Sequence, residues 1–249
     1  MQSGISLLHD NLKQLIAPMI KTYITDLINL FFPIYCIACE ENIHDEKIPL
    51  CTFCYTHLPE TNFFAIKDNP VEKIFYGRLL IEHAGCAYFY SKNSTIQKLV
   101  YALKYKNNTN CGTYLGRLLA SQLIKADWVK GVDVLMPVPL NKKREQKRGY
   151  NQAKLIAAGI SEILQIPIVE HAIVRRHFTE TQTHKTRTQR QQNMEDVFVI
   201  ENADLLNNKH VLIIDDIVTT GATLDACGNT ILKHTKNVKL SIAAVAMSI

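Results

Sequence analysis

An acidic pair followed by a turn rich in Thr and Gly is the part of this chain best suited to chemistry. Asp215 and Asp216 come after the apolar run 211–214, and they are followed by Thr219, Thr220, Gly221, Ala222 and Thr223. Backbone N–H groups in such a turn, and the start of a following helix, attract a phosphate dianion. Carboxylates can hold ribose hydroxyls directly or through Mg²⁺, which prefers oxygen ligands. The string predicts a site for a phosphorylated sugar; the alternative is an ordinary strand–turn–helix with surface carboxylates.

Cysteines near the N-terminus are spaced as metal ligands. Two C-x-x-C pairs are formed by Cys36 with Cys39 and by Cys51 with Cys54. Such pairs can place four thiolates tetrahedrally around Zn²⁺, and four cysteines leave no open coordination position. The sequence therefore predicts a structural zinc site, with His44 and His57 as nearby alternative ligands. A redox role would need a thioredoxin-like strand and helix around the pair, and the sequence lacks that pattern.

Positive charge is concentrated in two segments, 140–154 and 171–193, although the whole chain has a net charge of only +5. We expect both segments to flank the predicted phosphate site, which favours an anionic ligand. The residues expected to contact DNA or another anion are Lys143, Arg144, Lys147, Arg148, Tyr150, Arg175, Arg176, Arg187 and Arg190. The first segment can also be interpreted as a solvated basic loop. Residues 175–193 of the second segment have no periodicity, which predicts either a flap over the site or a loop along a nucleic-acid backbone.

Composition and motifs argue against several other classes of protein. The chain contains neither a G-x-x-x-x-G-K-[ST] loop for ATP nor a G-x-G-x-x-G dinucleotide fingerprint. Its beginning lacks the layout of a signal peptide, and the apolar stretch 27–37 is too short to span a bilayer. We therefore expect a cytoplasmic protein that is not integral to a membrane. In a reducing compartment, seven cysteines indicate metal ligands or free thiols.

Apolar strands that alternate with amphipathic helices must position these residues. Strands are predicted at 84–90, 132–138, 168–174, 197–200, 211–214 and 240–247, and helices at 94–103, 114–126, 151–164 and 224–233. This order predicts a parallel sheet with helices on both faces and a ligand at the carboxyl ends of its strands. A helix interrupted by Pro18 is expected over 5–31. The expected parts are a helical segment 1–35, a zinc finger 36–62 and an α/β domain 63–249.

The acidic pair and its turn resemble the ribose-phosphate loop of type I phosphoribosyltransferases, which bind phosphoribosyl pyrophosphate (PRPP). The whole set of motifs is similar to the ComF/GntX family of amidophosphoribosyltransferase-like competence proteins. The matching stretches are Cys36–Cys39, Cys51–Cys54, Leu103–Tyr105, Pro137–Pro139, Lys147–Gln152, Thr179–Gln182, Arg190–Asn193 and Asp215–Thr223. The resemblance implies a type I phosphoribosyltransferase-like parallel sheet flanked by helices, joined to a small N-terminal helical and zinc-finger module.

The resemblance also implies how PRPP would bind. The 5′-phosphate would lie on the turn 219–223, and the ribose on Asp215 and Asp216 with Mg²⁺. Leu140, Asn141 and Lys142 stand where type I phosphoribosyltransferases place their pyrophosphate loop.

Three functions remain open at this point. The resemblance implies a competence protein that handles single-stranded DNA during natural transformation, with a protein of the competence machinery as a further partner. The second is an active Mg²⁺-dependent phosphoribosyltransferase that moves ribose 5-phosphate from PRPP to a nitrogen acceptor, with Asp215 and Asp216 as its catalytic residues. The third is a PRPP or nucleotide sensor that reports through the zinc finger. The acidic pair favours a bound sugar or metal, because carboxylates would repel the phosphates of DNA alone.

Overall fold

The computed structural model describes residues 31–45, 47–176 and 197–248. The helix expected over 5–31 falls almost wholly outside these ranges, as do Arg187, Arg190 and most of the expected flap. The chain divides into two compact units, Met1–Tyr55 and Thr56–Ile249. The borders predicted at residues 35 and 62 stay predictions.

The described part of the first unit is built around a short antiparallel ribbon. Strand β1 (Ile34–Tyr35) pairs with β2 (Asn42–Ile43). A tight turn joins the strands, in which the Glu40 N–H donates to the Cys36 carbonyl at 2.9 Å. Helix α2 (Thr52–Thr56) begins directly after Cys51. The turn of this ribbon therefore contains the first cysteine pair, Cys36 and Cys39.

The second unit is organised by a parallel sheet of four strands in the order β3-β8-β7-β4. Its strands are β3 (His83–Tyr90), β4 (Val134–Pro137), β7 (His210–Val218) and β8 (Lys239–Ser248). Pairing of β7 with both β8 and β4 puts it inside the sheet, where both of its faces are covered. Its first residues after His210 are accordingly apolar without alternation, as expected for a buried parallel strand.

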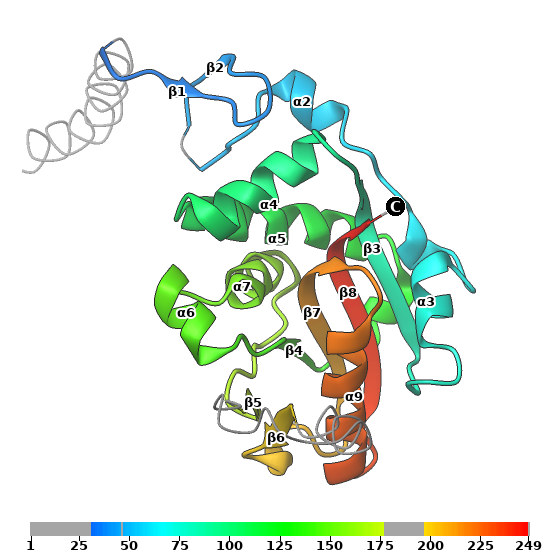
Figure 1. Cartoon of the computed structure of the whole chain (residues 1–249). Helices are drawn as coiled ribbons and strands as arrows, with labels where there is room; N and C mark the ends of the chain where they lie inside the picture. Colours follow the sequence, from blue (N-terminus) through cyan, green and yellow to red (C-terminus); the bar gives the residue numbers. More distant parts are fainter. Residues whose placement is uncertain (1–30, 46, 177–196, 249) are drawn as a thin grey trace, which may run out of the picture. The chain divides into compact units, whose positions relative to one another are not determined.

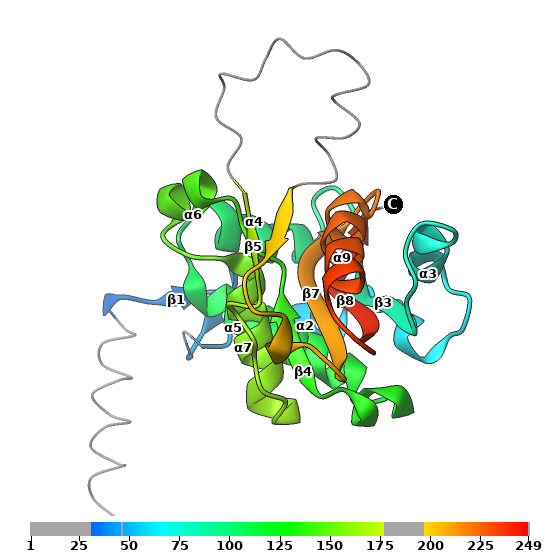
Figure 2. The ribbon, with the colours of Figure 1, turned by 90° about the horizontal axis from the view of Figure 1, so that it is seen from below.

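Helices cover both faces of this sheet, as Figures 1 and 2 show. Helices α4 (Thr95–Tyr105), α5 (Thr109–Leu123) and α7 (Gln152–Leu164) lie on one face. Helices α3 (Pro70–Phe75) and α9 (Ala222–His234) lie on the other. Short 3₁₀ helices occupy Phe63–Ala65, Asp127–Gly131 and Ala203–Leu205. The predicted fold class, a helix-flanked parallel sheet, is confirmed. Among the described residues, no helix combines the length and the apolar character that crossing a membrane requires.

Helices α5 and α7 are in close backbone contact through two glycines. A Cβ atom on Gly116 would lie 2.1 Å from the Ile156 carbonyl oxygen, and one on Gly159 would lie 2.1 Å from the Thr113 carbonyl oxygen. Real Cβ atoms do not approach so closely, so glycine is required on both helices. This contact fixes α7, whose N-terminus points to the carboxyl edge of the sheet.

Two strand predictions are wrong in detail. Residues 168–174 do not form a strand of the main sheet: Ile168 makes a single bridge to Leu135, and β5 (Ile173–Arg175) pairs antiparallel with β6 (Phe198–Ile200) in a separate ribbon. The Leu135 N–H donates to the Pro167 carbonyl, and the Leu135 carbonyl accepts from the Val169 N–H. The next residue of β4 that faces this segment is Pro137, which has no N–H to donate. The proline therefore ends the pairing.

The second error concerns the end of the central strand. Residues 211–214 were expected to be followed by a turn, but β7 continues through Asp215 and Asp216 to Val218. The cause is β8, whose Ala244 and Ala246 stand opposite Asp215 and Ile217 and extend the ladder.

Candidate functional site

The acidic pair lies at the position where β7 no longer pairs with β4 but still pairs with β8. Strand β4 ends opposite Ile214, while β8 continues beside β7. The step leaves a cavity of about 300 Å³ at the carboxyl edge of the sheet, which we call the acidic cavity. Its described lining residues are Lys104, Tyr105, Val138, Pro139, Leu140, Arg144, Arg148, Asn151, Gln152, Ala153, Arg175, Asp215, Asp216, Ile217 and Thr223.

The Thr/Gly turn between β7 and α9 is held in place by the neighbouring helix α3. Gly221 has a φ of +71°, and a Cβ there would lie 2.7 Å from Ile74 and 2.9 Å from Phe75. Arg78 donates to the Thr220 carbonyl at 3.0 Å and forms an ion pair with Asp225 at 3.0 Å. Gly221 is the N-cap of α9 and has no side chain to bond the first N–H groups of the helix. The first N–H groups of α9 therefore have no side-chain cap and could bind an anion.

Repulsion between adjacent carboxylates is relieved by a lysine from a distant part of the chain. The Lys104 ammonium lies 2.8 Å from Asp216, and the Asp216 N–H donates to the Asp215 carboxylate at 2.8 Å. Burial raises the pKa of Asp215 to about 7, and the charge of Asp216 adds to the rise. The Asp216 N–H, Lys104 and Arg175 oppose it. One of the two carboxyls therefore exchanges a proton near neutral pH.

The basic segment after Pro139 forms a helix, not the loop predicted. Helix α6 (Lys142–Arg148) begins at Asn141, whose side chain accepts from the Lys143 N–H at 3.0 Å, and ends at Gly149 with a φ of 78°. An Asn cap and a left-handed glycine are strong helix boundary signals that outweigh the charge density. The helix points Arg144 and Arg148 toward the acidic cavity, where Arg175 joins them from β5.

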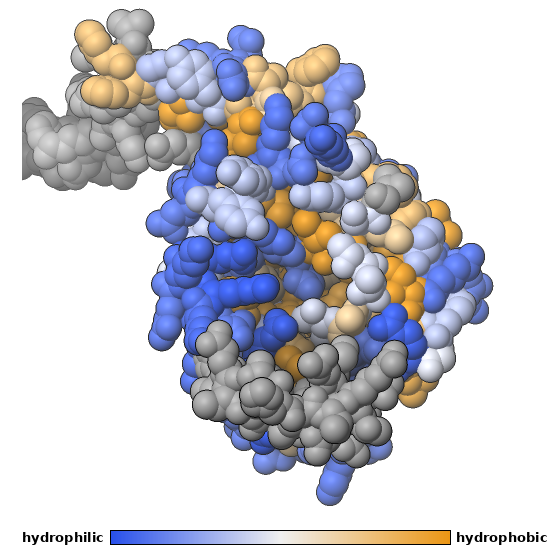
Figure 3. Space-filling view, viewed as in Figure 1, coloured by the Kyte–Doolittle hydropathy of each residue, from blue (hydrophilic) through white to orange (hydrophobic). Residues whose placement is uncertain are grey.

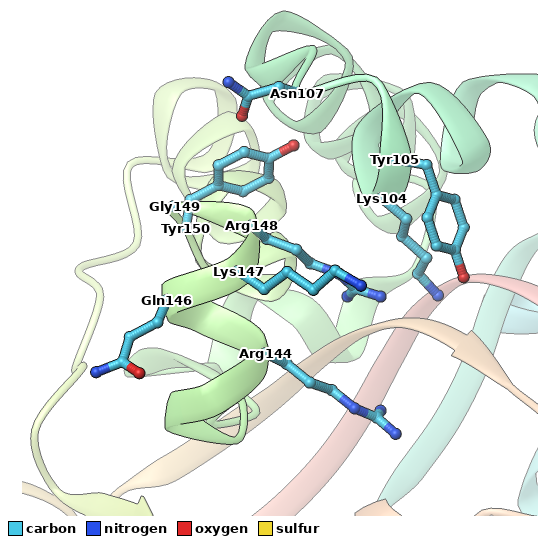
Figure 4. Close-up of a pocket in the computed structure, with 9 residues that line it drawn as sticks. All are labelled: Lys104, Tyr105, Asn107, Arg144, Gln146, Lys147, Arg148, Gly149 and Tyr150. Carbon is cyan, nitrogen blue, oxygen red and sulfur yellow. The ribbon is translucent and has the colours of Figure 1, made fainter.

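A second, larger cavity of about 800 Å³ adjoins the first and is basic, and we call it the basic cavity. Its described lining residues are Lys104, Tyr105, Asn107, Arg144, Gln146, Lys147, Arg148, Gly149 and Tyr150. Figure 4 shows Lys147 and Arg148 extending from α6 toward Lys104 at the end of α4. None of these lining residues is acidic. Figure 3 shows hydrophilic residues gathered around a hollow on this face.

Aromatic rings lie beside these cations. The Arg148 guanidinium lies 5.6 Å from the centre of the Tyr105 ring, and Tyr101 packs against Tyr105 with ring centres 5.0 Å apart. Tyr105 is 66% exposed, so much of its ring is available to a ligand. Tyr150, predicted to meet DNA, instead donates its hydroxyl to the Leu103 carbonyl at the end of α4. That bond fixes the wall between α4 and α6.

The structure brings together some of the predicted site residues and leaves others apart. Of the residues predicted to bind PRPP, Asp215, Asp216, Thr223 and Leu140 line the acidic cavity. Asn141, Lys142, Thr219, Thr220, Gly221 and Ala222 are not among its described lining residues. Of the predicted anion-binding residues, Lys143 and Arg176 are exposed outside both cavities. Residues at helix ends therefore contribute more to the lining of the two cavities than the predicted loop residues do.

Two residues of the site received no role from the sequence. Lys104 and Gln152 both stood within the matched motifs, but neither has a local pattern that reveals its contacts. Lys104 meets Asp216 across more than a hundred residues of sequence. The only available signal was the position of each residue at a helix end.

The second candidate site is the cysteine cluster of the first unit. The sulfur atoms of Cys36, Cys39, Cys51 and Cys54 all lie within 4.8 Å of one another. Burial raises the pKa of the Cys36 thiol, but the backbone N–H groups of Cys51, Cys39 and Ala38 lower it to about 7. Burial and the neighbouring thiols raise the pKa of Cys54, because several thiols share one small volume. Four sulfur atoms this close together could hold a metal.

A magnesium ion also fits the donor set of the acidic cavity, because carboxylate oxygens are the ligands that this hard cation prefers. Asp216 already forms an ion pair with Lys104. A metal that takes Asp216 would therefore have to replace the ammonium group.

The raised pKa of Asp215 predicts that the folded protein becomes less stable as the pH rises. The unfolded carboxyl ionises near pH 4 and the folded one near pH 7, so the stability that the neutral form provides is lost as the pH rises through this window. Asp215→Asn cannot ionise, and we expect it to melt a few degrees above the wild type at pH 8, with the gap closing toward pH 4. Glu201→Gln, at an exposed carboxylate, is the control. A gap independent of pH would contradict the assignment.

Comparison with known proteins gives one domain match and several relatives. Residues 148–248 match the phosphoribosyl transferase domain. Competence protein F of Haemophilus influenzae is 27% identical over 224 residues, which cover 82% of this chain and 93% of that protein. DNA utilization protein YhgH of Escherichia coli is 28% identical over 142 residues, or 56% of this chain and 62% of that protein.

A third relative matches a shorter region at higher identity. Competence protein ComFC of Bacillus subtilis is 37% identical over 108 residues, or 43% of this chain and 42% of that protein. The matched domain and these relatives agree with the motifs found in the sequence, and they support the resemblance of the chain to the ComF family.

Proposed function

We propose that the chain binds PRPP in the acidic cavity and handles single-stranded DNA in the cytoplasm during natural transformation. One observation supports the PRPP site most strongly. A single cavity contains two carboxylates, a threonine at the N-terminus of α9 and cations from α4, α6 and β5. PRPP is a ribose with an anionic group at each end, so its groups match this distribution of charge.

The proposed orientation follows from these groups. The 5′-phosphate lies at the start of α9 beside Thr223, where the helix terminus favours an anion. The ribose hydroxyls meet Asp215 and Asp216 with Mg²⁺. The diphosphate then lies toward Arg144, Arg148 and Arg175, which line the other side of the cavity. Charge-assisted hydrogen bonds from arginine are well suited to such oxygens.

The basic cavity is the proposed path for the DNA strand. Its cations would bind phosphates, and the exposed Tyr105 ring offers a surface for a base. Proteins that bind single strands without sequence preference combine these two features. Lys104, Tyr105, Arg144 and Arg148 line both cavities, so the strand and PRPP would lie next to each other.

An active phosphoribosyltransferase is the second candidate function, and the pKa of Asp215 favours it. A carboxyl that titrates near pH 7 can exchange a proton with a nitrogen nucleophile as pyrophosphate leaves. Release of pyrophosphate from PRPP in the presence of an acceptor would distinguish this function from binding alone.

The cysteine cluster is proposed to bind a structural Zn²⁺. Four thiolates complete its coordination, so the metal would stabilise the first unit and take no part in a reaction. A protein of the competence machinery is the proposed partner of the chain.

The acidic pair allows a direct test of the PRPP site. In the variant carrying Asp215→Asn and Asp216→Asn, we expect PRPP affinity to fall at least tenfold, because both ribose contacts and the metal ligands are lost. Affinity for inorganic pyrophosphate, which has no ribose, should stay the same or rise, since Lys104 is released from Asp216. Calorimetric titration of both ligands with Mg²⁺ measures this. Unchanged PRPP affinity in a folded variant would disprove the site.

Helix α6 provides a matched pair of lysines for the DNA path. Lys147 lines the basic cavity, whereas Lys143, on the same helix, is exposed outside it. We expect Lys147→Gln to weaken binding of an oligo-dT strand and to reduce the slope of log affinity against log salt by about 0.7, the value for one lost phosphate contact. Lys143→Gln is the control and should leave both quantities near the wild type. Equal effects of the two changes would argue against a defined path.

The metal site predicts the effect of losing one thiolate. We expect Cys36→Ser to lower the zinc content of the purified chain and to expose the first unit to proteolysis, because metal binding contributes to the folding of such modules. Cys111→Ala, at a buried cysteine of the second unit, should keep the metal. Full zinc content and an unchanged digestion pattern in Cys36→Ser would refute the proposal.

A further inference from the structure

A buried amide in the acidic cavity has a hydrogen-bond donor that the described residues do not use. Gln152 is 3% exposed, and its Nε2 is buried with no hydrogen-bond partner among the described residues. Its Oε1 accepts from the Arg148 guanidinium at 2.9 Å. Because a guanidinium can only donate, the oxygen must face Arg148, and the NH₂ group must be the atom left without a partner. Such a buried donor is costly, and native proteins rarely leave one unsatisfied.

The neighbouring Asn151 side chain has hydrogen-bond partners of its own. Gln152 is the first residue of α7, and the preceding Asn151 uses both polar atoms of its side chain: it donates to the Val138 carbonyl at 3.0 Å and accepts from the Ala153 N–H at 3.0 Å. Arg148, which holds the amide oxygen, lies over the Tyr105 ring. Arg148 therefore holds the oxygen of the amide, and Gln152 is part of the lining of the acidic cavity.

The charge of the cavity identifies the acceptor. Arg144, Arg148 and Arg175 line the cavity together with Gln152 and with the N-terminus of α7. An anionic oxygen is the acceptor that three guanidinium groups and a helix N-terminus favour. The ribose contacts are assigned to Asp215 and Asp216, so the remaining anionic group of a bound phosphoribosyl ligand is its diphosphate.

We propose that the Gln152 amide donates to a diphosphate oxygen of the ligand, and that it thereby selects PRPP over phosphoribosyl compounds without a diphosphate. This inference rests on the proposed PRPP site and adds the residue that distinguishes the ligand. Among the described residues the donor has no acceptor, and in this proposal the ligand supplies one. Loss of the donor should therefore weaken binding without weakening the fold.

Two substitutions distinguish the effect of losing the Gln152 N–H donor from the effect of losing the contact with Arg148. Gln152→Met removes both polar atoms at similar volume. Gln152→Glu keeps an oxygen for Arg148 but replaces the donor with a second acceptor, which a diphosphate repels. We expect PRPP affinity, measured by calorimetry with Mg²⁺, to fall about tenfold in the Met variant and further in the Glu variant. Affinity for ribose 5-phosphate should change less than twofold in the Met variant, because this compound has no diphosphate.

Stability provides an independent measurement. The melting temperature of the unliganded Met variant should equal or exceed that of the wild type, since a buried unsatisfied donor has been removed. Gln165→Met, at the other end of α7, is the control and should change neither affinity. Wild-type PRPP affinity in the Met variant, an equal loss for both ligands, or retained affinity in the Glu variant would each overturn the inference.

Failure of the proposed PRPP site would give a different result. If the wild type binds no PRPP, inorganic pyrophosphate is titrated into the wild type and the Met variant. Tighter binding of pyrophosphate by the wild type would support the role of Gln152 without PRPP. Equal binding, or no binding by either protein, would overturn it.

Discussion

Placing two adjacent carboxylates in one partly buried cavity is the constraint on which the rest of the site depends. Side by side, Asp215 and Asp216 repel each other, and burial adds to the cost of charging both. The protein meets this cost with a lysine from the end of α4, a backbone N–H within the pair and an arginine from β5. Each of these groups comes from a different element, so the site exists only when the α/β unit is folded around its sheet.

The position of those elements is set by backbone packing at a distance from the cavity. Gly116 and Gly159 let α5 and α7 approach until their backbones touch. The contact directs the first turn of α7, with Asn151 and Gln152, to the edge where β4 stops. Pro137 has a matching role in the sheet, because its missing N–H leaves the β4 edge unpaired and sends the next strand into a separate ribbon. Small departures from regular packing thus create the space for a ligand.

Lys104 connects the two cavities. It lines both of them, and in the structure its charge is neutralised by Asp216. The acidic cavity has charges of both signs, which suits a sugar with phosphates at its ends. Among its described lining residues the basic cavity has cations, two tyrosine rings and neutral residues but no carboxylate, which suits a chain of phosphates and bases. The two cavities lie side by side because α4 and α6 end at the same edge of the sheet, as Figure 4 shows for the basic cavity.

The sequence by itself determined the parallel sheet flanked by helices, the paired cysteines and the acidic pair before a turn. These features depend on short-range patterns: apolar runs, C-x-x-C spacing and a Thr/Gly turn. The tertiary structure alone decided that β7 runs on through the acidic pair, because β8 supplies partners for it. It also decided that Lys104 neutralises Asp216 and that the Gln152 amide has no acceptor among the described residues. Such contacts join residues far apart in the chain, and no local pattern encodes them.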